Sequence, residues 1–75
     1  MKLTKAQQRL IDDAKQAGYT VELGDTDVDI YKIRLGKVTR GIRLCENGKA
    51  YRLDIPLSDT TWINTQKNIR QYLGI

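Results

Sequence analysis

The sequence contains no histidine, and it has one cysteine and one proline. Histidine is the commonest general base and metal ligand in proteins, so its absence removes the usual means of acid–base catalysis. Cys45 has no second cysteine with which to form an internal disulfide, and no histidine to activate its thiol. We therefore predict no catalytic residue, no metal site and no cofactor, and we expect a reducing compartment, the cytoplasm.

Long apolar runs and a secretory signal are also missing from the sequence. No stretch approaches the roughly 20 apolar residues that a helix needs to span a bilayer, and the cations Lys2, Lys5 and Arg9 are not followed by an apolar segment. Phenylalanine is absent, and aromatic residues make up 7% of the chain. We expect a single domain over residues 1–75, away from membranes, with a small core that dimerisation would support.

Apolar spacing predicts a helix over residues 4–17. Leu10, Ile11 and Ala14 recur at helical intervals on one face. Thr4, with Gln7 three positions later, is typical of a capping box, in which each side chain bonds the backbone of the other residue. The glycine after this segment suits the left-handed residue that commonly follows a helix.

The apolar period changes to two after residue 18, which predicts strands. Candidate strands cover 19–23, 30–35, 42–45 and 51–55, with a turn at 24–27. Gly36 and Gly41 are expected to bracket a loop that contains Lys37 and Arg40. Asn47-Gly48 predicts a hairpin with a type I′ turn, because both central residues of that turn need positive φ.

A second helix is predicted near the end of the chain. Ser58 or Asp59 would cap its start, Trp62 would anchor it in the core, and Gly74 would follow its last turn. Short turns between consecutive strands require antiparallel pairing. The predicted fold is therefore α+β: an N-terminal helix, an antiparallel three- to four-stranded sheet and a C-terminal helix, with both helices on one face of the sheet.

Strand alternation also predicts where the positive charge lies. We take the aliphatic and tyrosine positions to face the helices: Tyr31, Ile33, Leu35, Ile42, Leu44, Tyr51, Leu53 and Ile55. The open face then carries the cations Lys32, Arg34, Arg43 and Arg52, with Lys37 and Arg40 at the strand ends. If these cations were instead scattered over several surfaces or lay beneath a helix, this case for a polyanion ligand would collapse, and only a small compact domain of unknown purpose would remain.

The central segment is strongly basic. Between Ile30 and Leu53 there are seven basic residues and one acidic residue, Glu46. Such a surface is suited to phosphate contacts, because lysine and arginine release condensed counterions from nucleic acid. The alternative is a solvated sheet face whose cations oppose edge pairing. Lys67 and Arg70, on the predicted second helix, form a second candidate patch.

The element order resembles the double-stranded-RNA-binding-domain architecture. Within that group, residues 64–75, which follow Ile55-Pro56-Leu57, resemble the end of the HicA toxin family. That resemblance implies cleavage of messenger RNA. The catalytic histidine of the family and the Gly-Ser-His stretch around it have no counterpart in this sequence, so the resemblance argues for the fold more than for the activity, and we do not predict a nuclease.

Three hypotheses follow from the sequence. The first is a small non-enzymatic module that binds DNA or RNA through a basic sheet face, and the sequence does not decide between the two nucleic acids. The second is a protein-interaction module, such as a phage or plasmid adaptor or inhibitor, which pairs a partner strand with 19–23 or with the strand ending at Ile55 or forms a homodimer. The third is a ribonuclease on the HicA plan.

Overall fold

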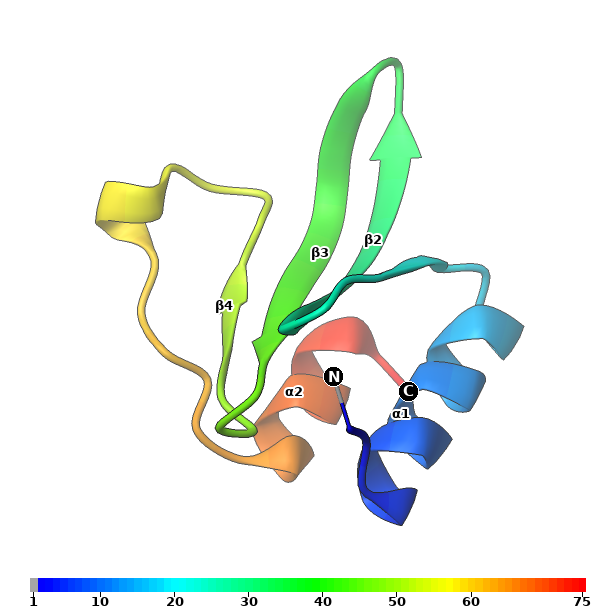
Figure 1. Cartoon of the computed structure of the whole chain (residues 1–75). Helices are drawn as coiled ribbons and strands as arrows, with labels where there is room; N and C mark the ends of the chain where they lie inside the picture. Colours follow the sequence, from blue (N-terminus) through cyan, green and yellow to red (C-terminus); the bar gives the residue numbers. More distant parts are fainter. Residues whose placement is uncertain (1) are drawn as a thin grey trace.

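The computed structural model describes residues 2–75 and confirms the α+β class. The chain order is α1 (Lys5–Gln16), β1 (Thr20–Leu23), β2 (Asp27–Arg34), β3 (Lys37–Cys45), β4 (Ala50–Arg52), the 3₁₀ turn η1 (Leu57–Asp59) and α2 (Gln66–Leu73). The antiparallel sheet has the order β1-β2-β3-β4, and both helices lie on one face of it (Figure 1). None of the helices in residues 2–75 is long and apolar enough to cross a membrane.

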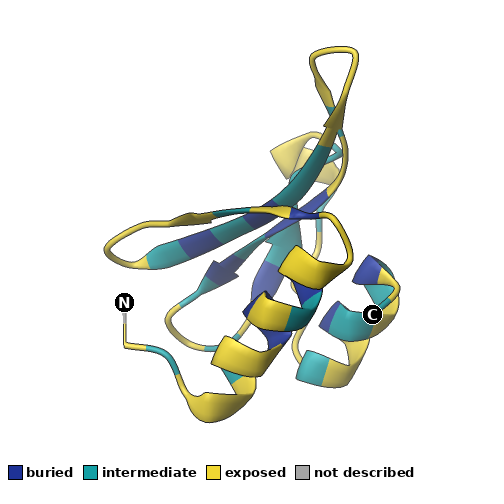
Figure 2. Cartoon of the chain, turned by 90° about the vertical axis from the view of Figure 1, so that its right-hand side faces the viewer, coloured by how far each residue is buried: buried dark blue, intermediate teal, exposed yellow. Residues whose placement is uncertain are grey.

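One core joins the two helices to the sheet. The buried apolar residues, coloured dark blue in Figure 2, come from both helices, from one side of three strands and from Tyr19 just before β1: Leu10, Ile11, Ala14, Tyr19, Val28, Ile30, Ile42, Leu44, Ala50, Ile69 and Leu73. Burying aliphatic side chains of this size contributes about 1.5–3 kcal/mol each relative to leaving them in water. The core therefore fixes which side of each strand faces the helices.

The predicted facing is right for β3 and wrong for β2 and β4. Val28 and Ile30 are buried under the helices, so Tyr31 and Ile33 point to the open side, and Ile33 is 58% exposed. On β4 the buried residue is Ala50, which turns Tyr51 outward. The prediction failed because Ile30 and Tyr31 are adjacent and both apolar. An apolar alternation of period two therefore fits the strand with either residue facing the helices.

Both ends of β3 differ in detail from the prediction. Instead of a loop between Gly36 and Gly41, a two-residue turn joins β2 to β3, with positive φ at Leu35 (53°) and Gly36 (77°). A hairpin does form at Asn47-Gly48, but the predicted type I′ turn is wrong: Asn47 does not have positive φ, and the hairpin has a three-residue loop, 46–48. In that loop the Gly48 N–H donates to the Cys45 carbonyl at 3.0 Å, and the glycine has φ 81°.

The first helix is confirmed with its capping box. The Gln7 N–H donates to the Thr4 hydroxyl at 3.1 Å, and the Thr4 N–H donates to the Gln7 side chain at 2.9 Å. Gly18 follows with φ 92°. These local bonds satisfy backbone groups that the first turn of a helix leaves unpaired.

The second helix starts later than predicted. It begins at Gln66, and its cap is Thr65, whose hydroxyl accepts from the Asn68 N–H at 3.2 Å. Trp62 lies outside the helix and is 52% exposed, so its predicted role as a core anchor is wrong. The predicted terminal glycine is confirmed: Gly74 has the left-handed conformation, with φ 74°.

The β2–β3 hairpin extends beyond the rest of the fold. In Figure 1 it projects away from both helices, and in Figure 2 its tip is coloured as exposed. Its base packs in the core while its outer half has neither a helix nor another strand against it. The hairpin therefore presents two different surfaces, one on each side of the ribbon.

Candidate functional site

The predicted basic open face is not present. Of the four cations assigned to it, Arg43 alone points to the open side among the residues that the structure describes. Lys32 and Arg34 follow Val28 and Ile30 on the helix-facing side of β2, because alternate residues of a strand share a side. Arg52 lies opposite the buried Ile42 and so also faces the helix side. This part of the prediction is wrong, so the case that strand alternation made for a polyanion ligand on the open face fails.

The cations gather instead on the helix-facing side of the projecting hairpin. Lys32 lies directly across from Arg40, and Arg34 lies across from Lys37. Residues paired in this way share one side of the sheet. We call these four residues, Lys32, Arg34, Lys37 and Arg40, the basic ribbon.

A β-bulge separates the two cation pairs of the basic ribbon. Lys32 pairs with Arg40 and Ile33 with Val38, so Thr39 is an extra residue on β3 without a partner on β2. The Thr39 hydroxyl lies 3.4 Å from the Lys32 carbonyl oxygen. The bulge therefore adds a side chain to β3 without interrupting the alternation of β2.

Two tyrosines lie against the base of the basic ribbon. The Lys32 Nζ lies 4.4 Å from the centre of the Tyr19 ring, and the Arg40 guanidinium lies 5.8 Å from the centre of the Tyr72 ring. Tyr19 is buried, and its hydroxyl donates to the Leu73 carbonyl at 2.7 Å. Burial also raises the pKa of Tyr72, whose hydroxyl accepts from the Gly41 N–H at 3.2 Å. Fixed ring faces of this kind attract cations and limit their motion.

The basic ribbon opens onto a groove at the C-terminal ends of both helices. The groove has a volume of about 490 Å³ and is lined by Ala17, Tyr19, Lys32, Thr39, Arg40, Leu73 and Gly74. No acidic side chain is among these lining residues, and over residues 2–75 none of the four ribbon cations forms an ion pair. Their charge is therefore not neutralised by a carboxylate of the described chain.

Arg52 lies on the same side as the basic ribbon, but it has a carboxylate partner. Its Nε and Nη2 atoms donate to Asp54 at 2.9 and 2.6 Å. The hydrogen bond with Arg52 lowers the pKa of Asp54 and raises that of Arg52 above its ordinary value. The Arg52 guanidinium also lies 5.1 Å from the centre of the Tyr72 ring, so this residue extends the site with a partly compensated charge.

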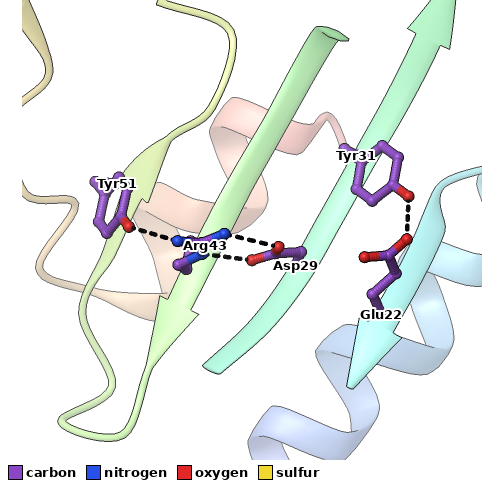
Figure 3. Close-up of polar contacts among 5 residues, drawn as sticks. All are labelled: Glu22, Asp29, Tyr31, Arg43 and Tyr51. Atoms are coloured by element: carbon purple, nitrogen blue, oxygen red, sulfur yellow. Dashed lines mark hydrogen bonds and ion pairs between the residues drawn. The ribbon is translucent and has the colours of Figure 1, made fainter. Parts of the chain in front are cut away.

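On the open side of the sheet, the charged side chains bond to other side chains of the same chain. Arg43 donates to both carboxylate oxygens of Asp29, at 2.8 and 3.1 Å, and to the Tyr51 hydroxyl at 3.2 Å (Figure 3). The Tyr31 hydroxyl donates to Glu22 at 2.6 Å. The bond to Asp29 raises the pKa of Arg43, and the bond to Glu22 raises that of Tyr31. Arg43 is therefore a structural cation with little charge to offer a ligand.

The second candidate patch is divided by the structure. Arg70 donates to Asp13 at 2.8 Å and lines a groove of about 590 Å³ between the helices, whereas Lys67 is exposed and not among the residues that line this groove. Lys5 and Arg9 line the groove too, although they were not among the cations predicted to form a site. Their spacing of four residues on a predicted helix would have placed them on one face.

No protein-family model, no curated protein and no solved structure matches this chain. The chemistry of the site therefore rests on its own geometry, which consists of uncompensated cations on a projecting ribbon beside an open groove.

Proposed function

We propose that this domain is a non-enzymatic module that binds the phosphate backbone of nucleic acid through the basic ribbon. One observation supports the proposal above all others: the four ribbon cations share one side of an exposed hairpin and have no carboxylate partner among residues 2–75. Cations in such a position can exchange solvent for phosphate oxygens and release counterions from the nucleic acid.

The shape of the site favours an extended polyanion over a small anion. Pockets for small ligands are concave and surround the ligand with converging polar groups. The ribbon cations are instead distributed along two strands: Lys32 and Arg34 are two residues apart, about 6.6 Å at the usual rise of a strand, and Lys37 and Arg40 are three residues apart across the bulge. A chain of phosphates can contact cations along this whole row, whereas one phosphate would use only part of it.

The proposal is tested by removing charge from the ribbon and comparing the effect with that of equal charge removed elsewhere. A single substitution would leave the other ribbon cations in place, so the test variant is R34A/K37A/R40A, and all three positions are exposed. Fluorescence anisotropy with DNA and RNA at several salt concentrations should show a loss of about 100-fold in affinity and a salt slope lower by roughly 2–3.

A matched control removes the same charge from other surfaces. Lys2, Lys15 and Lys49 are exposed and lie outside the basic ribbon, so K2A/K15A/K49A has the same net charge as the test variant. We expect this control to keep most of the affinity. Equal losses in the two variants would mean that only net charge matters, and unchanged affinity in the ribbon variant would exclude the ribbon as the site. RNA incubated with the protein should stay intact, and cleavage would favour the ribonuclease hypothesis instead.

A second candidate function, self-association, is favoured by the difference between the two edges of the sheet. The β4 edge is closed: Ala50 exchanges backbone bonds with Ile63 at 3.0 and 2.6 Å, and the Arg52 N–H donates to the Thr60 hydroxyl at 3.1 Å. Next to β1, the Gly24 N–H donates to the Asp27 carbonyl, so Gly24 and Asp27 form a hydrogen-bonded pair. Hydrogen-bonded and non-hydrogen-bonded pairs alternate along an antiparallel ladder. The backbone N–H and C=O groups of Val21 and Leu23 therefore point away from β2.

We propose a second copy of the chain as the occupant of the β1 edge. Facing residues of paired strands share a side, so a two-fold axis at Val21 would place Glu22 across from Thr20 of the second copy and avoid opposing like charges. Leu23, which is 67% exposed, would gain cover. Amide exchange at Val21 and Leu23 should slow as protein concentration rises, and L23K should abolish this effect while L57K preserves it. Exchange independent of concentration would exclude the dimer.

A further inference from the structure

The tip of the projecting hairpin contains an apolar residue that the fold does not explain. Leu35 is 94% exposed and has φ 53°, in the left-handed region where asparagine and glycine are favoured. The next residue, Gly36, has φ 77° and open space where a Cβ would be. Leu35 therefore accepts an unfavourable backbone conformation and gains almost no packing within the described chain.

The surroundings of Leu35 are cationic on one side and apolar on the other. Arg34 and Lys37 flank the turn as its closing pair. Ile33, 58% exposed, points to the opposite side of the ribbon. An apolar end thus projects beyond a row of cations, at the point of the molecule farthest from the helices in Figure 1.

We propose that Leu35 inserts between base pairs of duplex DNA while the basic ribbon contacts the neighbouring phosphates. This inference rests on the proposed function and deepens it by naming the ligand. β-Ribbons contact B-form DNA in the major or the minor groove, whereas the major groove of A-form RNA is too deep and narrow for side chains. Proteins that bind the minor groove insert apolar side chains between base steps, which unstacks the step and kinks the duplex.

The arrangement of the cations favours a duplex over a lipid surface. A membrane-inserting tip would be expected to have its cations in a ring around the apolar residue, at the depth of the headgroups. Here the cations run back from the tip along one side, from Arg34 and Lys37 to Lys32 and Arg40. Anions that contact this row of cations would lie alongside the hairpin, in the way that phosphates border a DNA groove.

The experiment uses a short DNA duplex with 2-aminopurine at a central TA step, because pyrimidine–purine steps unstack most easily. Binding of the unmodified protein should raise the 2-aminopurine fluorescence. L35N should abolish that rise and weaken binding about tenfold, while the salt slope stays unchanged because the ribbon cations are intact. The control is L57N, the same substitution at a residue that is 73% exposed on η1.

The outcomes separate this inference from the function on which it rests. Salt-dependent binding without a fluorescence rise, or a rise that L35N preserves, would overturn insertion and leave phosphate binding in place. Absence of salt-dependent binding would overturn both. Binding of the protein to anionic vesicles that L35N abolishes, with no change on the duplex, would assign the tip to a lipid surface and overturn insertion into DNA.

Discussion

The two sides of the sheet contain the same kinds of charged residue and use them differently. On the open side, Arg43 is bonded to Asp29 and Tyr51, so its charge holds neighbouring strands together. On the helix side, Arg40 has a tyrosine ring beside it and no ion pair among residues 2–75. The difference shows that a count of cations does not locate a binding surface, because each cation must also be free of an internal carboxylate.

The largest expected effect concerns the close packing of the open side. A Cβ at Gly41 would lie 2.7 Å from the Tyr31 Cβ and 3.1 Å from the Ile30 carbonyl oxygen. Gly41→Ala should therefore lower the free energy of unfolding by about 1–3 kcal/mol, measured by urea denaturation. Thr39→Ala, on the same strand, is the control and should change it much less. An unchanged midpoint for Gly41→Ala would contradict the close approach.

The next effect compares one arginine from each side. Arg43→Ala leaves Asp29 without its partner and should cost about 1–2 kcal/mol of stability, with little change in affinity for nucleic acid. Arg40→Ala should do the reverse, weakening binding several-fold with little change in stability. Urea denaturation and anisotropy on both variants measure this. The same pattern in both would mean that the two sides do not differ in function.

A smaller effect is expected at the hairpin tip. Leu35→Asn relieves the left-handed leucine and should raise the free energy of unfolding by about 1 kcal/mol. The same variant is expected to lose base insertion, so stability and binding should change in opposite directions. Thermal and urea denaturation test the gain. A loss of stability would show that Leu35 packs within the fold after all.

The smallest effect concerns the partly compensated Arg52. Asp54→Asn frees this arginine and should strengthen nucleic-acid binding a few-fold. The folded-state pKa of Asp54 is lowered, so its stabilising contribution is present above the ordinary carboxyl pKa of about 4 and is lost as pH falls through the lowered value. Denaturation at several pH values should show that the wild type is more stable than Asp54→Asn at neutral pH. The difference in the free energy of unfolding should shrink at acidic pH. A difference that is independent of pH would contradict the pairing.

Local signals predicted the ends of the fold better than its sheet. The capping box at Thr4 and the terminal Gly74 depend on neighbouring residues alone, and both are confirmed. The facing of β2 depends on the register with β3 and on the core, and the adjacent apolar residues Ile30 and Tyr31 left it undecided. The predicted start of the second helix is too early because serine and aspartate at 58 and 59 are as suitable for capping as Thr65.

Four of the eight cations proposed from the sequence lie together in the basic ribbon, and Arg43, Arg52, Lys67 and Arg70 lie outside it. The sequence identified Lys32, Arg34, Lys37 and Arg40, but the prediction placed two of them on the wrong side and two in a loop. The partner of Arg43 comes from another strand and could not be assigned without the register. The partner of Arg52 is two residues away, a spacing that keeps both side chains on one side of an extended segment.

The extra residue in β3 has a consequence for the form of any ligand. A bulge increases the right-handed twist of a hairpin locally, so the charge pairs before and after Thr39 are turned relative to each other about the long axis of the hairpin. A straight rod of anions would meet one pair and pass by the other. A strand that winds as it advances could follow both, so under the proposed function the twist favours a helical polymer as the ligand.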